Sequence, residues 1–575
     1  HIRSSARART SAMSSMTGQP PARPHPLRRL DDSLRLLVNA ALGSLAVRDP
    51  YSMLRLTAVV FALARLLKRL RVAALSQGIK AYLVSLVLPW VKQIPLVQRK
   101  LASETEKVRK SLEPEILKDL TAPCTRLPHA GCSETEVLTL METRRALDTK
   151  YWSEGHVTGA IYHGKQAYMD YIGKVYGMFA FTNPLHAAIH PATRQMEAEV
   201  IQMVINLYHG HSGCVGAFTT GGTESILMAM KAYRDHARER RGITEPNIVA
   251  AVTAHAAFDK AAQYFGLQLR HARVNASMEV DVEDVRRLVD SNTVAIVGSA
   301  PQYAHGTIDP IEDLAAIALR RGCGLHVDCC LGGFLLPFME QAGFSLPCKY
   351  DFRVPGVTSI SCDPHKYGFA PKGASVVMFS AAELRHSMYT FVTEWTGGIY
   401  ATPTILGSRP GGIVAATWAA LRSHGVSGYI ETTKLIVGAC KEIGKAIEAI
   451  DGIELVGRTD VCVVAFGAAR GSGLNVYSLC DAMKDLRGWD IATLQHPAAA
   501  HLALTLPTSA NAPQFAEDMR RAVTMLRADE SGKYSGGTAG IYGMAASLPA
   551  SFIEESVKVY LDTYTKAAPD PEEEV

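Results

Sequence analysis

Five short runs rich in β-branched residues alternate with helical stretches along the middle of the chain, and this rhythm limits the possible folds more than any other feature. Strands separated by helix-length segments are typical of a largely parallel sheet covered by helices, with the active site at the carboxyl ends of the strands. We therefore predict an α/β fold. The runs are 248–253, 293–299, 324–328, 357–361 and 374–379.

The chain continues well beyond these runs on both sides. After about residue 430, a helical stretch precedes the short apolar runs 453–456 and 461–466, which predicts a smaller C-terminal α/β domain. Six regions are expected in chain order: a disordered basic tail (1–50), a membrane-associated segment (51–95), an N-terminal arm (96–190), a large domain (191–430), the small domain (431–565) and an acidic tail (566–575).

The composition narrows the class of protein. Of the 575 residues, 47% are hydrophobic and 20% are charged, which is typical of a globular enzyme and not of a disordered chain. The net charge of +5 is modest, and no basic stripe is interleaved with aromatic residues, so we expect no nucleic-acid partner. The eleven cysteines form no CxxC pair, which argues against structural zinc and favours a reducing compartment.

The segment 51–95 mixes apolar runs with Arg and Lys residues. Its longest uncharged run, 81–91, covers 11 residues, whereas a spanning helix needs about 20 nearly uninterrupted apolar residues. We therefore favour a basic amphipathic segment at a membrane surface, or a poor single span with positive flanks. The alternative is a helix that packs on the body of the enzyme.

A lysine and an aspartate lie at the carboxyl ends of two consecutive predicted strands. Lys366 lies in the segment 361–368 (Ser-Cys-Asp-Pro-His-Lys-Tyr-Gly), and Asp328 ends the strand before it. A carboxylate at the end of an apolar strand needs a cationic partner, because an unpaired buried charge is costly. Lys366 could hold pyridoxal phosphate as a Schiff base while Asp328 keeps its pyridine nitrogen protonated. Burial is expected to lower the pKa of Lys366 and so make its amine nucleophilic.

Further polar residues lie at strand ends and at one helix start. The segment Gly221-Gly-Thr-Glu-Ser225 begins a helix whose free N–H groups and dipole could bind the cofactor phosphate, although a plain helix cap would look similar. His255, after the first run, could stack on the pyridine ring or could simply be a packed residue. A pyridoxal phosphate site is predicted by the order of four features along the chain: the segment 221–225, His255, Asp328 and Lys366. The residues expected to contact the cofactor, besides Asp328 and Lys366, are Gly222, Thr223, His255, His305, Thr307 and His365.

With these residues assembled, the chain resembles the fold-type I pyridoxal phosphate enzymes. It is most similar to the branch that group II amino-acid decarboxylases share with sphingosine-1-phosphate lyases, and more similar to the lyases. The likeness spans roughly 150–510 and implies a large domain with a mostly parallel seven-stranded sheet, a smaller C-terminal domain, and a site shared within a homodimer. The most specific segments are Asp363-Pro-His-Lys-Tyr-Gly-Phe-Ala-Pro-Lys-Gly373 and Gly407-Ser-Arg-Pro-Gly-Gly412.

The resemblance also implies roles for individual residues. Lys366, His255 and the phenols of Tyr162 and Tyr400 are expected at the reaction centre, and Ser408 is expected to reach the cofactor of the partner subunit. A second lysine, Lys372, is not needed for the cofactor but suits a phosphorylated substrate; it could instead be an ordinary solvent-exposed lysine. The residues expected to bind the substrate phosphate are Asn183, His186 and Lys372.

The implied reaction is cleavage of a phosphorylated long-chain sphingoid base between C2 and C3, to a fatty aldehyde and phosphoethanolamine. The general base stays open among Tyr162, Tyr400, His255 and Lys366. The resemblance further implies residence in the endoplasmic reticulum membrane, with the catalytic domain facing the cytosol. One alternative is a pyridoxal-phosphate-dependent amino-acid decarboxylase. Another is a membrane-tethered binding protein without catalysis, against which the presence of Lys366 and Asp328 argues.

Overall fold

A computed structural model describes residues 57–63, 90–91, 93–118, 123–535 and 550–567, with the single positions 87 and 121. The chain falls into two units, 1–84 and 85–575, and the elements below all belong to the second. The predicted basic tail lies outside the described residues, as do most of 51–95 and nearly all of the acidic tail. None of the helices in the described ranges is long and apolar enough to cross a membrane.

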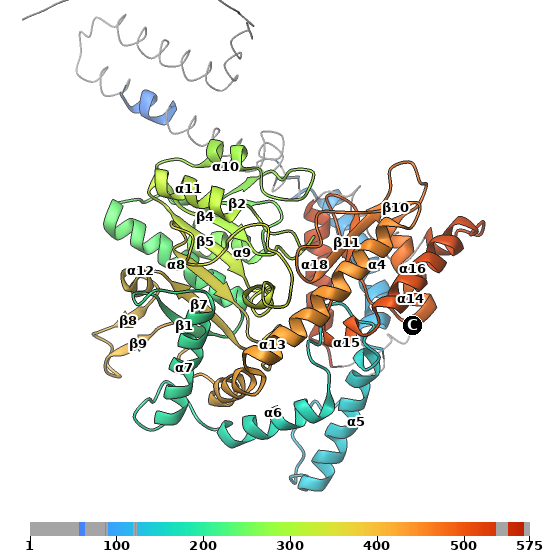
Figure 1. Cartoon of the computed structure of the whole chain (residues 1–575), viewed down its shortest axis with the longest axis horizontal. Helices are drawn as coiled ribbons and strands as arrows, with labels where there is room; N and C mark the ends of the chain where they lie inside the picture. The colour runs from blue at the N-terminus through green and yellow to red at the C-terminus, as the bar shows by residue number, and fades with distance from the viewer. Residues whose placement is uncertain are drawn as a thin grey trace, which may run out of the picture. The chain divides into compact units, whose positions relative to one another are not determined.

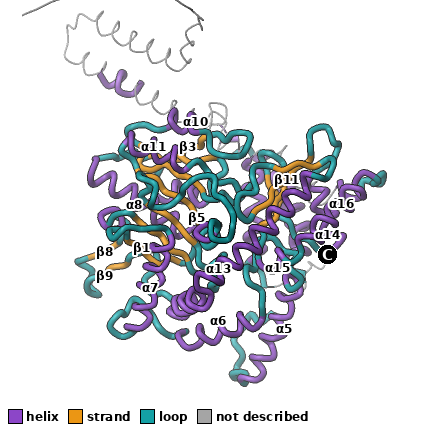
Figure 2. Tube along the Cα trace, viewed as in Figure 1, coloured by secondary structure: helices purple, strands orange, loops and turns teal. Residues whose placement is uncertain are grey.

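A seven-stranded sheet forms the centre of the large domain (Figures 1 and 2), as predicted. The strand order is β1-β7-β6-β5-β4-β2-β3, and only β7 runs antiparallel to its neighbours. The five predicted runs match β2, β4, β5, β6 and β7 to within two residues. The strands are β1 (Val215–Thr219), β2 (Asn247–Ala251), β3 (Gln268–Ala272), β4 (Thr293–Ser299), β5 (Gly324–Cys329), β6 (Ser359–Cys362) and β7 (Ser375–Phe379).

Helix α8 (Gly222–Arg241) supplies much of the apolar core against this sheet. Glu224 lies in its first turn and three arginines lie in its last turn, so its charges complement the helix dipole. Gly242 ends the helix in the left-handed conformation, with φ 64°. The other helices of the large domain are α7 (Pro191–Leu207), α9 (Ala257–Phe265), α10 (Val282–Leu288), α11 (Ile311–Arg321), the 3-10 turn η1 (Leu336–Phe338) and α12 (Ala382–His386).

The long helix α13 (Gly411–Glu448) connects the large domain to the small one. It kinks at Gly425, where φ is 57° and ψ is −175°. The predicted boundary at residue 430 therefore falls inside a helix rather than in a linker. The small domain holds a four-stranded antiparallel sheet of order β10-β11-β13-β12. Its elements are β10 (Ile453–Leu455), β11 (Val463–Ala468), α14 (Val476–Arg487), β12 (Ala492–Leu494), β13 (Ala499–Ala503), α15 (Leu506–Ser509), α16 (Ala512–Arg527) and the 3-10 turn η2 (Lys533–Ser535).

The predicted N-terminal arm is helical, and the C-terminal helix packs on its first helix. Lys566, just after α18, pairs with Glu113 of α4 at 3.3 Å. Ser133 starts α5 with a capping box that it forms with Glu136. A separate hairpin, β8–β9, carries exposed apolar side chains. These elements are α4 (Pro95–Ile116), α5 (Glu134–Trp152), α6 (Gln166–Phe179), β8 (Thr390–Val392), β9 (Tyr400–Thr402) and α18 (Ala550–Tyr564).

Candidate active site

Three chain segments meet at the carboxyl edge of the large sheet. Strands β5 and β6 are parallel neighbours, so the loops that follow Asp328 and Cys362 leave the sheet on the same side. The start of α8 lies against both loops. A Cβ added to Gly222 would lie 2.7 Å from Asp363 Oδ2 and 2.8 Å from Cys330 Sγ. Only glycine therefore lets the helix start approach this closely.

Lys366 is paired rather than free. Its Nζ lies 3.0 Å from Oδ2 of Asp363, a carboxylate that is almost completely buried. Burial lowers the pKa of Lys366, but the charge and hydrogen bond of Asp363, together with nearby Cys330 and Tyr162, outweigh burial and raise the pKa well above the usual value. Our expectation that burial would leave this lysine with a lowered pKa is therefore wrong for the cofactor-free chain. The reason is a carboxylate three residues away that the sequence argument did not use.

Asp328 is the last residue but one of β5, and one of its carboxylate oxygens accepts hydrogen bonds. Its Oδ1 accepts hydrogen bonds from the Cys330 amide and the Ser361 hydroxyl, each at 3.0 Å. Burial raises the pKa of Asp328, but His255, His326 and the hydrogen bonds of Cys330 together outweigh burial and lower the pKa below its usual value. Both bonds end on Oδ1 and so leave Oδ2 available for a cation.

Two predicted histidines flank this centre. His255 lies exposed before α9, close enough to Asp328 to affect its pKa, and its Nδ1 accepts a hydrogen bond from the Ala257 amide at 3.1 Å. His365 accepts from the Ala374 amide at 3.3 Å, and its Cε1 lies 3.6 Å from the Cβ position of Gly221. The structure therefore brings His365 to the helix start that was predicted to bind phosphate.

Tyr162 and Lys372 lie together beside Lys366. The Nζ of Lys372 lies 4.5 Å from the centroid of the Tyr162 ring, a cation–π contact. Partial burial and the charge of Lys366 lower the pKa of Lys372 to about 8, although its side chain keeps contact with solvent. Burial raises the pKa of Tyr162 well above its usual value. Lys372 is therefore an exposed residue, as the alternative interpretation expected, but its ammonium packs on the Tyr162 ring.

Four predicted residues gather elsewhere on the chain. The Oδ1 of Asn183 accepts from the Arg409 amide at 3.2 Å, which places it beside Ser408. Ser408 is exposed, and so are His186 and Tyr400. Across the ranges that the structure describes, no hydrogen bond, ion pair or ring contact joins these four residues to Lys366. We call Asn183, His186, Tyr400 and Ser408 the second cluster and the groups around Lys366 the lysine cluster. The Ile405 amide, which follows β9, donates to Glu224 Oε1 in the first turn of α8 at 3.0 Å, so this part of the chain borders the helix start of the lysine cluster.

His305 and Thr307 lie in the loop after β4, where the small domain packs. The Thr307 hydroxyl donates to Ser277 O at 3.1 Å and accepts from the Arg458 amide at 3.0 Å. His305 is buried, and its Nδ1 lies 3.2 Å from Gln302 Nε2. Burial lowers the pKa of His305 to about 4, so this imidazole is neutral at pH 7. Contact of either residue with a cofactor stays a prediction.

Sequence reasoning missed Asp363 and Tyr303. Asp363 has its Oδ1 buried without a partner, and Tyr303 is close enough to Lys366 for the lysine charge to act on its pKa. The position of Asp363 just after a predicted strand could have identified it, because the same reasoning had identified Asp328. Tyr303 carried no such signal.

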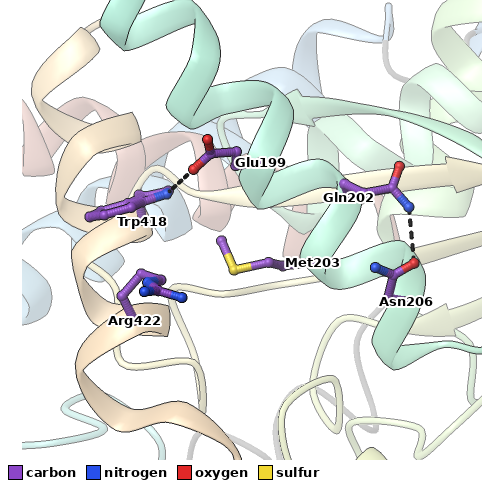
Figure 3. Close-up of a pocket in the computed structure, with 6 residues that line it drawn as sticks. All are labelled: Glu199, Gln202, Met203, Asn206, Trp418 and Arg422. Atoms are coloured by element: carbon purple, nitrogen blue, oxygen red, sulfur yellow. Dashed lines mark hydrogen bonds between the residues drawn. The ribbon is translucent and has the colours of Figure 1, made fainter.

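A groove of about 420 Å³ lies between α7 and α13, away from this centre (Figure 3). Trp418 Nε1 donates to Glu199 Oε2 at 2.6 Å, and Gln202 bonds Asn206 at 2.9 Å. No predicted site residue lines this groove, so we do not take it as the active site. Its lining residues are Glu199, Gln202, Met203, Asn206, Trp418 and Arg422.

The lysine cluster fits pyridoxal phosphate. Lys366 offers an amine for the aldehyde, Asp328 Oδ2 is available for the pyridine nitrogen, and the start of α8 offers backbone N–H groups for the phosphate. The unpartnered Oδ1 of Asp363 shows a polar site that the protein alone does not satisfy.

Comparison with known proteins decides the family. Residues 126–469 match the pyridoxal-dependent decarboxylase conserved domain. The sphingosine-1-phosphate lyase of Drosophila melanogaster is 43% identical over 479 residues, which cover 82% of this chain and 87% of that protein. The chain belongs to the sphingosine-1-phosphate lyases. The rat sphingosine-1-phosphate lyase 1 is 42% identical and covers 83% of the chain and 84% of its own length.

Solved structures agree with this family assignment. The sphingosine-1-phosphate lyase of Burkholderia pseudomallei superposes with a TM-score of 0.69 at 37% identity, covering 75% of this chain and 98% of its own. A glutamate decarboxylase of Lactobacillus brevis superposes with a TM-score of 0.61 at 21% identity, covering 71% of this chain and 96% of its own. The second likeness shows the shared fold alone.

Proposed function

We propose that this lyase-family chain cleaves phosphorylated long-chain sphingoid bases between C2 and C3, to a fatty aldehyde and phosphoethanolamine. Family membership supports the reaction. The observation that carries the substrate class is the second ammonium, Lys372, packed on Tyr162 beside Lys366. An amino-acid decarboxylase needs no such group, whereas a substrate phosphate needs a cation close to the reacting carbon.

Bound pyridoxal phosphate would supply the electron sink that stabilises the charge left at C2 when the bond breaks. Lys366 would hold the cofactor, and Asp363 would balance the charge of the lysine whenever its amine is free. Asp328 would keep the proton on the ring nitrogen. Because its raised pKa keeps the Tyr162 phenol protonated, Tyr162 would donate a hydrogen bond to the substrate rather than remove the C3 hydroxyl proton.

The decisive experiment incubates the purified holoenzyme with sphingosine 1-phosphate and separately with glutamate and aromatic amino acids. We expect fatty aldehyde and phosphoethanolamine from the first incubation, and none from the Lys366→Ala variant. Lys372→Gln should raise KM for the phosphorylated base by about tenfold or more and leave the absorbance of the bound cofactor unchanged. Release of CO₂ from an amino acid, without aldehyde from the lipid, would overturn the proposal.

We also propose that the enzyme is a homodimer whose site is completed by the second cluster of the partner chain. The exposed β8–β9 hairpin and its neighbouring loop supply apolar surface for such an interface, with Phe391, Trp395, Ile399 and Ile405 all more than half exposed.

Finally, we propose attachment to the endoplasmic reticulum membrane through residues 51–95, with the catalytic domain in the cytosol. Support comes from the apolar and basic texture of that segment and from eleven free thiols, which suit a reducing compartment. A reporter fused to residues 1–100 should sediment with reticulum membranes and remain open to added protease. A soluble reporter, or one protected from protease, would contradict the proposal.

A further inference from the structure

A line of buried polar side chains runs beneath the catalytic edge of the large sheet. His326 and Asp328 are two residues apart on β5, and Ser359 and Ser361 are two residues apart on β6, so all four point to one face. The strand register places His326 opposite Ser359 and Asp328 opposite Ser361. Tyr233 of α8, which packs on this face, adds a phenol to the line.

Hydrogen-bonding distances join these groups without a gap. Tyr233 Oη lies 2.6 Å from Ser359 Oγ, and Ser359 Oγ lies 2.7 Å from His326 Nδ1. His326 Nε2 lies 3.2 Å from Ser361 Oγ, which donates to Asp328 Oδ1 at 3.0 Å. All five side chains are buried. The line ends at the carboxylate that is to face the pyridine nitrogen.

The chemistry of these groups fixes the direction of every proton. Ser361 has one hydroxyl proton and gives it to Asp328, so it must accept from His326 Nε2–H. Burial lowers the pKa of His326 to about 4, so its imidazole is neutral and its Nδ1 accepts from Ser359. Ser359 then accepts from the Tyr233 phenol, whose oxygen also lies 2.7 Å from Thr358 Oγ1. Each donor in this line points toward Asp328. Hydrogen bonds in such a line polarise one another, which strengthens the last bond, from Ser361 to Asp328.

We propose that His326 is a positioning residue that, through Ser361, holds Asp328 as an oriented anion and so keeps the bound cofactor's ring nitrogen protonated. The His326 imidazole is completely buried, so it can act on the site only through its neighbours in this line, which end at Asp328. Asp328 is the charged group at the end of this hydrogen-bonded line. The ring of Phe258 in α9 packs against the His326 imidazole, at 5.8 Å between centroids. The inference rests on the proposed use of pyridoxal phosphate.

Two variants of His326 test this hydrogen-bonded line without a large change in side-chain volume. The Gln amide extends as far as the imidazole Nε2, whereas the Asn amide extends only as far as Nδ1. His326→Gln should therefore keep the donor to Ser361, and His326→Asn should lose it. The readout is the ¹⁵N chemical shift of pyridoxal phosphate labelled at the ring nitrogen and bound to the protein, followed from pH 6 to 10.

We expect the ring nitrogen of the His326→Asn protein to lose its proton at a pH about one unit lower than in the wild type. We also expect its cofactor dissociation constant to rise about tenfold. His326→Gln should lie close to the wild type in both respects. Tyr233→Phe, which removes the first donor, should shift the nitrogen in the same direction as Asn but less.

Tyr208→Phe is the matched control, because Tyr208 is an equally buried phenol whose hydroxyl bonds Gly333 O at 3.0 Å outside the line. It should leave the ¹⁵N shift unchanged. Thermal unfolding of the cofactor-free proteins distinguishes a loss of folding from the loss of the hydrogen bond to Ser361. Equal ¹⁵N titrations for Asn and Gln, or an equal shift for Tyr208→Phe and Tyr233→Phe, would overturn the inference. A wild type that binds no cofactor would overturn the proposed function as well.

Discussion

At the residue scale, the ion pair between Lys366 and Asp363 sets the state of the reactive amine. Asp363→Asn removes the charge and keeps the shape, so the lowering effect of burial on the pKa of Lys366 is then opposed only by Cys330 and Tyr162, whose effects are smaller than that of burial. We expect Lys366 of the cofactor-free protein to become acylable at a pH about two units lower than in the wild type. Mass spectrometry of acetylation against pH measures this, with exposed Lys434 as the internal control.

The same pair has a predictable effect on stability. Because the folded-state pKa of Lys366 is raised, the pair stabilises the fold fully below the unfolded pKa of about 10.4 and loses this effect as pH rises through the folded pKa. At pH 7 the Asn variant should therefore lose about 3 kcal/mol of unfolding free energy, since it leaves a buried ammonium unpaired. An unchanged acylation midpoint and unchanged stability would show that Asp363 does not control the amine.

At the scale of elements, the strands that the sequence predicted are those made of β-branched apolar residues. Strand β3 carries Arg270 and His271 and was missed, because its arginine becomes tolerable only through tertiary partners: Leu288 O at 2.6 Å and Asp290 at 2.7 Å. Strand β13 was missed since it consists of three alanines, His501 and Leu502. Propensity describes single residues, and these two strands depend on their neighbours.

The candidate site shows the same division. Motifs within one loop, such as Lys366 with His365, could be read from the sequence because their spacing is local. The hydrogen-bonded line from Tyr233 to Asp328 could not, since it joins α8, β5 and β6 through a register that only the folded sheet defines.

One close approach between elements gives a sharp stability test. Gly306, with φ 71°, lies where an added Cβ would come within 2.8 Å of Val463 O in β11 of the small domain. Gly322 has φ 63° but nothing within 4 Å. Gly322→Ala should cost about 1 kcal/mol for the left-handed backbone alone, and Gly306→Ala about 3 kcal/mol because steric overlap adds to it. Denaturant unfolding measures both; equal costs would mean that the two domains can separate at this contact freely.

At the scale of the whole molecule, the proposed shared site would make the function a property of the dimer. In the proposed dimer, a second copy of the chain would bring its β8–β9 hairpin, with Tyr400, to Lys366. In a twofold dimer each subunit would then give one cluster and receive the other. The exposed apolar side chains of the β8–β9 hairpin would be covered in the same step.

This arrangement predicts complementation between two inactive variants. Lys366→Ala and Tyr400→Phe should each be inactive alone, but a heterodimer of the two holds one site with both intact residues and one with neither. Equal co-expression makes about half of the dimers mixed, each with one working site, so the preparation should recover about a quarter of wild-type activity. Two affinity tags isolate the mixed dimer, which should show about half. No recovery in a verified heterodimer would mean that both residues serve the same subunit's site, and a monomer in solution would remove the basis of the shared site.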